Sequence, residues 1–298
     1  MAKMTLTALA APGCRTILLL VLAIVFSQGA LHVARGETSA GEPPLYNLQC
    51  DRAKFRVILD VGHTAEVPGA ISARGVTEYE FNLRLAKNIE QKLIDAGFAR
   101  TVLLLTAGPA TGGLFKRVAR ANAPRANLLL SIHHDSVPDI FKKEWEHEGK
   151  KHRFSDRFKG HSIFISHDNS DRKGSRLFGN LLGNQLKASG LQYTPHYTEA
   201  FMGRRQRELV DVEAGVYRFD QLHVLRATKM PAVLLEAGLI INRDEELLLG
   251  SPEHQSVIAG AVVNAVEIFC ATRSPRRPSV KKAVRSAVAP PQTKALNY

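Results

Sequence analysis

Two histidines and two carboxylates in this chain of 298 residues could form a metal-dependent hydrolytic site. His63 follows the apolar segment VILDV, the run His133-His134-Asp135 follows LLLSI, and Glu236 follows AVLL. In an open α/β sheet, ligands bind outside the carboxyl ends of the parallel strands, so these side chains are expected at one sheet edge. One strand-end histidine alone is usually structural. Three such positions together favour a zinc site, because two imidazoles and a carboxylate suit zinc and leave a position for water.

The remaining carboxylate ligand is expected close to His63, where the sequence offers Glu66, Glu78 and Glu80. Thr77 and Glu80 match a capping box, in which the glutamate hydrogen-bonds back to the amide of the N-cap residue. Glu80 therefore has a structural role, whereas Glu78 is able to turn toward the strand ends. We expect this helix start to be exposed, so that Glu78 packs little against the core.

Apolar segments alternate with amphipathic segments from residue 55 onward. Buried strands are predicted at Val57–Leu59, Thr101–Thr106, Leu128–Ile132, Ser162–Ser166 and Ala232–Leu235. Helices are predicted at Thr77–Ala96, Leu114–Ala123, Ser175–Ser189 and Pro252–Phe269. The alternation predicts an α/β fold, a single three-layer domain with a mostly parallel (mixed) central sheet flanked by helices. Residues 137–160 and 191–220 are predicted to be surface loops or lids.

The two ends of the chain differ in composition from the middle. Residues 1–36 contain a basic start, the apolar run Ile17–Phe26 and a region of small residues, which together predict a secretory signal peptide. An uncleaved membrane anchor is the alternative, but a membrane-spanning helix needs about 20 apolar residues. Residues 273–298 are basic and rich in proline, and we expect them to be disordered. Ten of the 40 basic residues and none of the 28 acidic residues lie in these two ends, so the middle is nearly neutral.

These features predict a signal peptide (1–36), a short N-terminal linker (37–51), a catalytic domain (52–272) and a disordered tail (273–298). Export would leave Cys50 and Cys270 in the mature protein, one at each end of the domain. In an oxidising compartment such a pair favours a disulfide, with two reduced thiols as the alternative.

Four motifs resemble those of the zinc-dependent N-acetylmuramoyl-L-alanine amidases of bacterial cell-wall turnover. In family order they are ILDVGHTAEVPGA, GVTEYEFNLRLA, RVARANAPRANLLLSIHHDS and VLRATKMPAVLLEAGLIINRDEE, and the resemblance covers most of residues 55–271. It implies that His63, Glu78 and His133 bind one zinc ion and that Glu236 is the catalytic glutamate. Strand position alone does not distinguish His133 from His134, and the choice rests on the match to SIHHDS.

The resemblance implies hydrolysis of the amide bond between N-acetylmuramic acid and the L-alanine of the peptidoglycan stem peptide. It further implies an exported enzyme of the periplasm or cell envelope, with peptidoglycan as substrate and an activator protein as a candidate partner. We expect no nucleic-acid partner, and membrane contact only through the signal peptide. The alternatives are a zinc peptidase that cuts another wall bond and an inactive wall-binding protein. Glu236 and the complete ligand set argue against an inactive protein, which has no need of them.

The sequence also departs from the family pattern. Val61 and Thr64 replace the proline and second glycine usual around the first histidine. Some secreted members carry an inhibitory helix after the strand that follows the second histidine, but here the extra length lies before that strand and after the next helix. Self-inhibition is therefore left open. Two further roles are also open: Asp60 could orient the His63 imidazole, and the arginines of the segment GRRQREL (Arg204, Arg205 and Arg207) could bind stem-peptide carboxylates or be solvated.

Overall fold

The computed structural model describes residues 50–273, all of which belong to one compact unit. The predicted signal peptide lies outside these residues, as does the basic tail apart from Arg273, which ends the last helix. The boundaries expected for these two segments therefore stay predictions.

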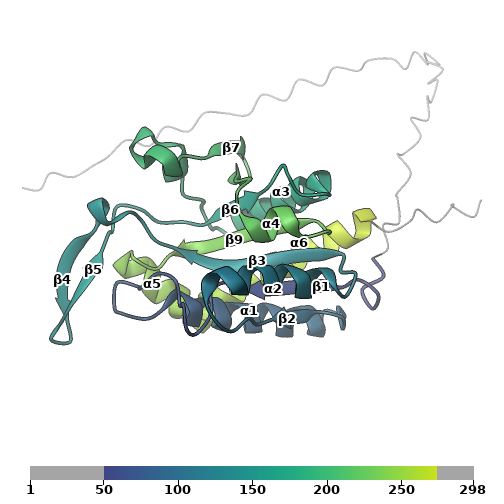
Figure 1. Ribbon diagram of the computed structural model, residues 1–298, viewed down its shortest axis with the longest axis horizontal. Helices are drawn as coiled ribbons and strands as arrows, with labels where there is room; N and C mark the ends of the chain where they lie inside the picture. The colour runs from purple at the N-terminus through teal and green to yellow at the C-terminus, as the bar shows by residue number, and fades with distance from the viewer. Residues whose placement is uncertain (1–49, 274–298) are drawn as a thin grey trace, which may run out of the picture. The chain divides into compact units, whose positions relative to one another are not determined.

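A seven-stranded mixed sheet forms the centre of the domain, in the order β2-β1-β3-β9-β6-β8-β7 (Figure 1). The strands are β1 (Val57–Val61), β2 (Val102–Leu104), β3 (Leu128–Asp135), β6 (Ser162–Ile165), β7 (Glu208–Asp211), β8 (Val216–Arg218) and β9 (Ala232–Leu239). Neighbouring strands run parallel from β2 to β9, and again between β6 and β8. The β9–β6 and β8–β7 pairs are antiparallel. The predicted α/β class and the mostly parallel, mixed sheet are confirmed.

Helices cover both faces of this sheet (Figure 1). One face packs against α1 (Glu78–Asp95), α3 (Arg172–Ala188) and α6 (Pro252–Arg273), and the other against α2 (Ala110–Asn122) and α4 (His223–Ala227). The short helix α5 (Arg243–Gly250) follows β9. Helix α1 buries Phe81, Leu85 and Ile89 against the sheet. Their spacing of four residues places them on one side of a helix, which is why the sequence pattern located it.

Among residues 50–273, α6 alone is long and apolar enough to cross a membrane by length and composition. Half of its most apolar window is buried inside the domain. Its buried residues belong to the main core, together with those of α1 and β3. The apolar composition of α6 therefore reflects its place in the core.

The two segments predicted to be loops contain regular structure. Residues 137–160 include η1 (Asp139–Phe141) and a hairpin of β4 (Lys143–His147) and β5 (Lys150–Phe154), which projects from the sheet (Figure 1). Residues 191–220 include η2 (His196–Thr198), η3 (Ala200–Arg205), the edge strand β7 and its neighbour β8, which lies between β6 and β7. The prediction failed because the hairpin strands have no buried residue, so they lack an apolar pattern. The prediction that β2 is a buried strand was also wrong, because β2 lies at an edge of the sheet and its Val102 is exposed.

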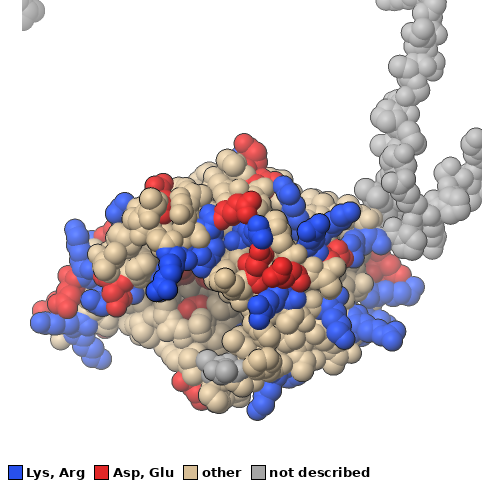
Figure 2. Space-filling view, turned by 45° about the horizontal axis from the view of Figure 1, so that its top comes forward, with Lys and Arg blue, Asp and Glu red and all other residues tan. Residues whose placement is uncertain are grey.

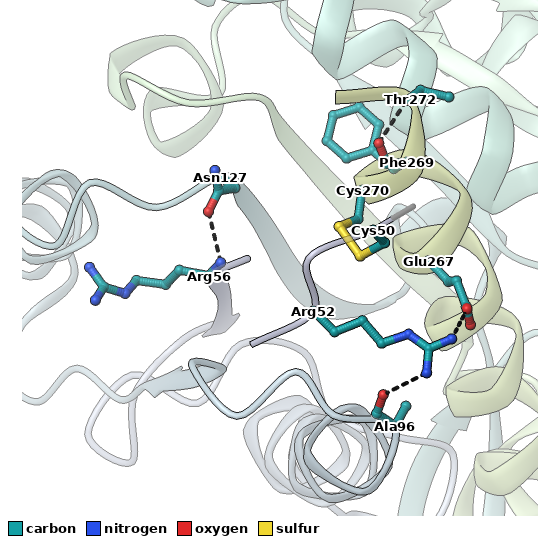
Figure 3. Close-up of a disulfide and its surroundings, with 9 residues drawn as sticks. All are labelled: Cys50, Arg52, Arg56, Ala96, Asn127, Glu267, Phe269, Cys270 and Thr272. Atoms are coloured by element: carbon teal, nitrogen blue, oxygen red, sulfur yellow. Dashed lines mark hydrogen bonds and ion pairs between the residues drawn. A yellow bond between two sulfur atoms is a disulfide. The ribbon is translucent and has the colours of Figure 1, made fainter. Parts of the chain in front are cut away.

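A disulfide joins Cys50 to Cys270, as the sequence predicted (Figure 3). The Cα atoms are 5.1 Å apart, although 220 positions separate the two residues in the chain. Beside it, the Arg52 guanidinium forms an ion pair with Glu267 of α6 and donates a hydrogen bond to the carbonyl of Ala96 at the end of α1. The segment before β1, the end of α1 and the last turns of α6 are thus held together near the amino end of β1.

Candidate active site

The three proposed metal ligands come from different elements and converge at the carboxyl edge of the sheet. His63 follows β1, Glu78 opens α1 and His133 lies near the end of β3. Glu78 Oε2 is 3.0 Å from His63 Nε2, and Glu78 Oε1 is 3.0 Å from His133 Nδ1. The three residues offer ligand atoms that all lie within 4.8 Å of one another. The structure therefore brings together two nitrogen donors and one oxygen donor.

Glu78 is buried, with 5% of its surface exposed, so the expectation of an exposed helix start was wrong. The α1 N-terminus packs under the β1–α1 loop, whose Ala70 amide donates to Glu78 Oε2 at 3.0 Å. The Asn82 side chain donates to Glu78 Oε1 at 3.3 Å. Burial alone would raise the pKa of Glu78, but hydrogen bonds from His133 and His63 hold that pKa below its ordinary value. Glu78 is thus held as a carboxylate, the form that binds a metal.

The backbone of His63 adopts a left-handed conformation, with φ of 66°. Such a conformation is uncommon for a residue other than glycine, and it persists where the surroundings impose it. Arg117 of α2 supplies that constraint, since its guanidinium donates to the carbonyls of Val61 at 2.8 Å and His63 at 2.7 Å. Asp60 pairs with Arg117 and accepts a bond from Ser131 at 2.6 Å. Asp60 therefore acts on the backbone that carries His63 through Arg117, and not on the imidazole.

Two glycines leave space for the ligand side chains. A Cβ atom at Gly62 would lie 2.4 Å from the His133 ring, and one at Gly69 would lie 2.4 Å from Glu78 Oε2. Gly69 also has a φ of +81°, which L side chains rarely adopt. The β1–α1 loop thus passes directly over the ligands because it has glycine at these positions.

His134 has a structural role. It is buried against Phe81, and its Nδ1 lies 2.8 Å from Asn82 Oδ1. Burial lowers the pKa of His134 to about 3, so the ring is neutral. The side chain of Asn82 thus links His134 to Glu78, which supports the choice of His133 over His134 as the proposed ligand.

Glu66 and Glu80, the other two carboxylates considered, lie outside the cluster. Glu66 is exposed. Glu80 Oε1 accepts a hydrogen bond of 3.1 Å from the Thr77 hydroxyl, and the Glu80 amide donates back to that hydroxyl at 3.4 Å. Thr77 is therefore the N-cap of α1, as predicted. The Glu80 carboxylate bonds to the Thr77 hydroxyl, whereas the capping box predicted a bond to the Thr77 amide.

Glu236 of β9 lies directly across from His133 of β3 in the sheet register. Its Oε2 is buried and has no hydrogen-bond partner among the described residues. Burial raises the pKa of Glu236 well above its ordinary value, and the nearby carboxylates of Asp135 and Glu78 raise it further. A partly desolvated carboxyl group with raised proton affinity is suited to accept and return a proton near neutral pH.

Two residues beside Glu236 had no role assigned from the sequence: Asp135, which was placed at the strand end, and Tyr197, which was not considered. Asp135 is buried, and it accepts a hydrogen bond from the Tyr197 hydroxyl at 2.7 Å and another from the Ser136 amide at 2.7 Å. Burial raises the pKa of Asp135 to about 7 despite these bonds. Asp135 belongs to the motif SIHHDS, and the structure places it at the strand end as expected. Tyr197 gave no such signal, because it lies in a segment predicted to be a loop.

The three arginines of the GRRQREL segment do not act as one group. Arg207 stacks on Phe219, with its guanidinium carbon 3.7 Å from the ring centroid. Arg204 and Arg205 are exposed at the end of η3. Figure 2 shows basic and acidic side chains interspersed over the visible surface, in agreement with the near-neutral charge of the middle of the chain. Arg204 and Arg205 therefore stay candidates to bind stem-peptide carboxylates, whereas Arg207 packs against Phe219.

Comparison with known proteins identifies the family. The profile of Amidase_3, described as N-acetylmuramoyl-L-alanine amidase, matches residues 57–268. The chain belongs to this amidase family. It is 26% identical over 226 residues to the N-acetylmuramoyl-L-alanine amidase AmiC of Neisseria meningitidis, covering 72% of this chain and 53% of that protein. The chain thus spans about half the length of this curated relative.

Solved amidase structures share the fold. The catalytic domain of CwlV, an amidase from Bacillus (Paenibacillus) polymyxa, aligns with a TM-score of 0.52 at 26% identity over 72% of this chain and 97% of that chain. The amidase CwlD of Clostridioides difficile, solved in complex with the GerS lipoprotein, aligns with a TM-score of 0.53 at 18% identity over 73% and 99% of the two chains. The family, the fold and the enzyme class predicted from the sequence are confirmed.

Proposed function

We propose that this member of the amidase family hydrolyses the bond between N-acetylmuramic acid and L-alanine in peptidoglycan, with zinc held by His63, Glu78 and His133 and with Glu236 as general base. The observation that carries the proposal is the β3–β9 register, which pairs a proposed ligand, His133, with Glu236. The two side chains therefore project from adjacent strands on the same face of the sheet.

The residues present fit a zinc ion. Two imidazole nitrogens and one carboxylate oxygen form a donor set typical of catalytic zinc, and Gly69 leaves the space that the Glu78 carboxylate occupies. Glu78 is held as a carboxylate by donors on both oxygens. Zinc bound there would supply a Lewis acid for the amide carbonyl and would lower the pKa of the water nucleophile.

Glu236 would move the proton during the reaction. Its raised proton affinity lets it take a proton from the attacking water and deliver that proton to the departing amine of L-alanine. No hydrogen bond from the described residues competes for its buried Oε2. Glu236 Oε2 is thus not engaged by another described group that would have to be displaced before it accepts a proton.

Export to the periplasm or cell envelope is part of this proposal. It is supported by the signal-like composition of residues 1–36 and by the Cys50–Cys270 disulfide, which is stable in an oxidising compartment. An activator protein stays a proposed partner. The structure of CwlD with the GerS lipoprotein supports it, because a member of the same fold binds a second protein.

The test is digestion of purified peptidoglycan by the mature protein, with and without a chelator, followed by mass spectrometry of the released ends. Release of stem peptides that begin with L-alanine, lost with chelator and restored by zinc, is expected. Cut peptide cross-links would show the alternative zinc peptidase. An unchanged wall after zinc addition would support the inactive wall-binding protein.

A further inference from the structure

A cavity of about 780 Å³ lies beside the proposed active site and is not used by the mechanism above. Its lining includes residues that precede β6, residues that follow α3, and parts of α5 and α6. Ala237, the neighbour of Glu236 on β9, also lines it. Because side chains alternate along a strand, Ala237 and Glu236 face opposite sides of the sheet. At β9 the cavity therefore lies on the other face of the sheet from Glu236, although His196 in its lining lies 3.8 Å from Asp135 beside the site. Its volume suits a small organic ligand or a short peptide.

The segment after α3 forms a fixed wall of the cavity. The amide of His161 donates to the carbonyl of Gln192 at 3.1 Å, and the amide of Thr194 donates to the carbonyl of His161 at 2.8 Å. A Cβ atom at Gly160 would lie 2.6 Å from the Gln192 carbonyl oxygen, so glycine permits this close approach. The wall is thus held by backbone bonds to the start of β6.

Two buried histidines line the cavity and have incomplete hydrogen bonding at their ring nitrogens. His161 is 4% exposed, and neither of its ring nitrogens has a hydrogen bond of normal geometry among the described residues, although the Gln192 backbone lies close enough to raise the pKa of the ring against the larger, lowering effect of burial. His196 is 2% exposed; its Nδ1 lies 2.7 Å from the Thr194 hydroxyl, and its Nε2 has no hydrogen bond within the described part of the chain and lies 3.8 Å from Asp135 Oδ2. A neutral imidazole carries one N–H group, and buried polar groups in proteins nearly always have partners. The weak contacts with Gln192 and Asp135 leave hydrogen-bonding capacity on both rings that a ligand in the cavity could use.

The charges at the cavity favour an anionic ligand. Arg157 and Lys159 line it, and neither forms an ion pair within residues 50–273. Two carboxylates also line it, Glu199 and Glu245. Both oxygens of Glu245 already accept backbone amides, from Gly160 at 2.8 Å and from Leu239 at 3.0 Å. Arg157, Lys159 and Glu199 are all exposed, so two cations without an ion pair accompany the one carboxylate that is not engaged by the backbone.

The remaining walls are apolar. Phe158 and Phe201 contribute aromatic rings, and Leu191 and Leu248 contribute aliphatic surface. The Arg157 guanidinium stacks on both rings, with its central carbon 4.9 Å from the Phe158 centroid and 4.7 Å from the Phe201 centroid. A ligand that fits must therefore combine an anionic group with short apolar groups.

We propose that this cavity binds a short peptide through a free carboxylate, with His161 and His196 as hydrogen-bond donors and Lys159 as the counter-charge. A peptide combines carboxylate and carbonyl acceptors with small side chains, which matches the donors and the apolar walls. The binding of a peptide carboxylate does not depend on the proposed function. Only the identification of the ligand as the peptidoglycan stem peptide rests on that function. This stem peptide is either still attached to the glycan strand or already released.

The test is calorimetric titration of the mature protein with a synthetic L-alanyl stem tetrapeptide and with its carboxyl-amidated form. His161→Phe keeps a planar ring and removes both nitrogens, so binding should weaken roughly tenfold or more while the melting temperature is kept or raised. Lys159→Gln should weaken binding roughly threefold or more. Lys151→Gln, an exposed lysine on β5 outside the cavity, is the matched control and should leave binding unchanged.

Equal binding of the amidated peptide, or wild-type affinity in both His161→Phe and Lys159→Gln, would overturn the proposal, as would the absence of binding at millimolar peptide. A raised KM on peptidoglycan in these variants would identify the attached stem peptide as the ligand. An unchanged KM with weakened binding of free peptide would identify the released peptide. The titration does not require the enzyme to turn over. A protein that binds the peptide but does not hydrolyse peptidoglycan would therefore contradict the proposed function and leave the proposed peptide site intact.

Discussion

The Tyr197 hydroxyl donates a hydrogen bond of 2.7 Å to Asp135 Oδ2, and it connects a segment predicted to be a loop to the centre of the site. Asp135 follows the proposed ligand His133 by two residues, and its charge raises the pKa of Glu236. Tyr197 is also fixed by His196, whose ring centroid lies 4.2 Å from its own. The η2 segment is therefore anchored at the proposed general base.

We expect Tyr197→Phe to lower kcat roughly tenfold and to leave the zinc content unchanged. The variant loses one hydrogen bond to Asp135, and the free energy of one hydrogen bond, about 1 kcal/mol, is close to that of a tenfold change in rate. Tyr217→Phe is the control, since Tyr217 donates a bond of the same length, 2.7 Å, to the carbonyl of Thr194. Both variants should lose about 1 kcal/mol of stability. Equal kcat values in the two variants would show that the contact with Asp135 has no catalytic effect.

Glu236→Gln should retain zinc and the fold but lose about 10²–10⁴-fold in turnover, because glutamine keeps the shape of the side chain and cannot accept the proton. Its measurement is the rate of peptidoglycan hydrolysis alongside metal content and melting temperature. A zinc-replete variant with more than about a tenth of the wild-type rate would exclude the role of general base.

Glu78→Ala and Glu80→Ala should behave differently although the two residues lie in the same turn. Glu78→Ala removes one of the three proposed ligands and should abolish stoichiometric zinc binding. Because Glu78 is buried, we also expect a lower melting temperature than a surface substitution would give. Glu80→Ala should lose only about 0.5–1 kcal/mol of cap stability and keep zinc. Loss of metal in Glu80→Ala with retention in Glu78→Ala would contradict the proposed ligand set.

Gly69→Ala should weaken zinc binding, and Gly108→Ala should not. Both glycines have positive φ, +81° and +94°, so both variants should lose about 1 kcal/mol from backbone strain. Only at Gly69 would the new Cβ atom meet the Glu78 carboxylate, because no described atom lies within 4 Å of the Cβ position at Gly108. Equal zinc affinity in the two variants would refute the steric role of Gly69.

Glu245 should make the wild type lose stability as the pH rises. Burial raises its pKa from 4.5 to about 7, so between these values the folded protein holds a proton that the unfolded chain has released. The stabilisation is therefore complete below pH 4.5 and is lost as the pH rises through about 7. Relative to Glu245→Gln, the wild type should lose on the order of 2–3 kcal/mol across this range. Parallel unfolding curves for the two proteins from pH 4.5 to 7.5 would contradict the raised pKa.

The sequence predicted the elements that have an apolar pattern. The central strands were located because they are continuous apolar runs, and α1 because its buried side chains repeat at a spacing of four. Strand-end positions indicated His63, the pair His133-His134 and Glu236, whereas the choice of His133 over His134 rested on the resemblance to the amidase family. The β4–β5 hairpin and β7 escaped prediction since they bury too little apolar surface to show a pattern. Tyr197 and Arg117 escaped for another reason. Their roles depend on contacts over 62 and 54 positions with Asp135 and His63, which no local pattern encodes.

The Cys50–Cys270 disulfide determines where the rest of the chain joins this domain. The Cα atoms of the two cysteines are 5.1 Å apart near the amino end of β1, whereas the ligand cluster lies beyond the carboxyl end of the same strand. The segments before Cys50 and after Arg273 therefore join the domain at one pole, opposite the edge that would meet substrate. Any attachment made through either segment would therefore act at this one end of the domain, away from the ligand cluster.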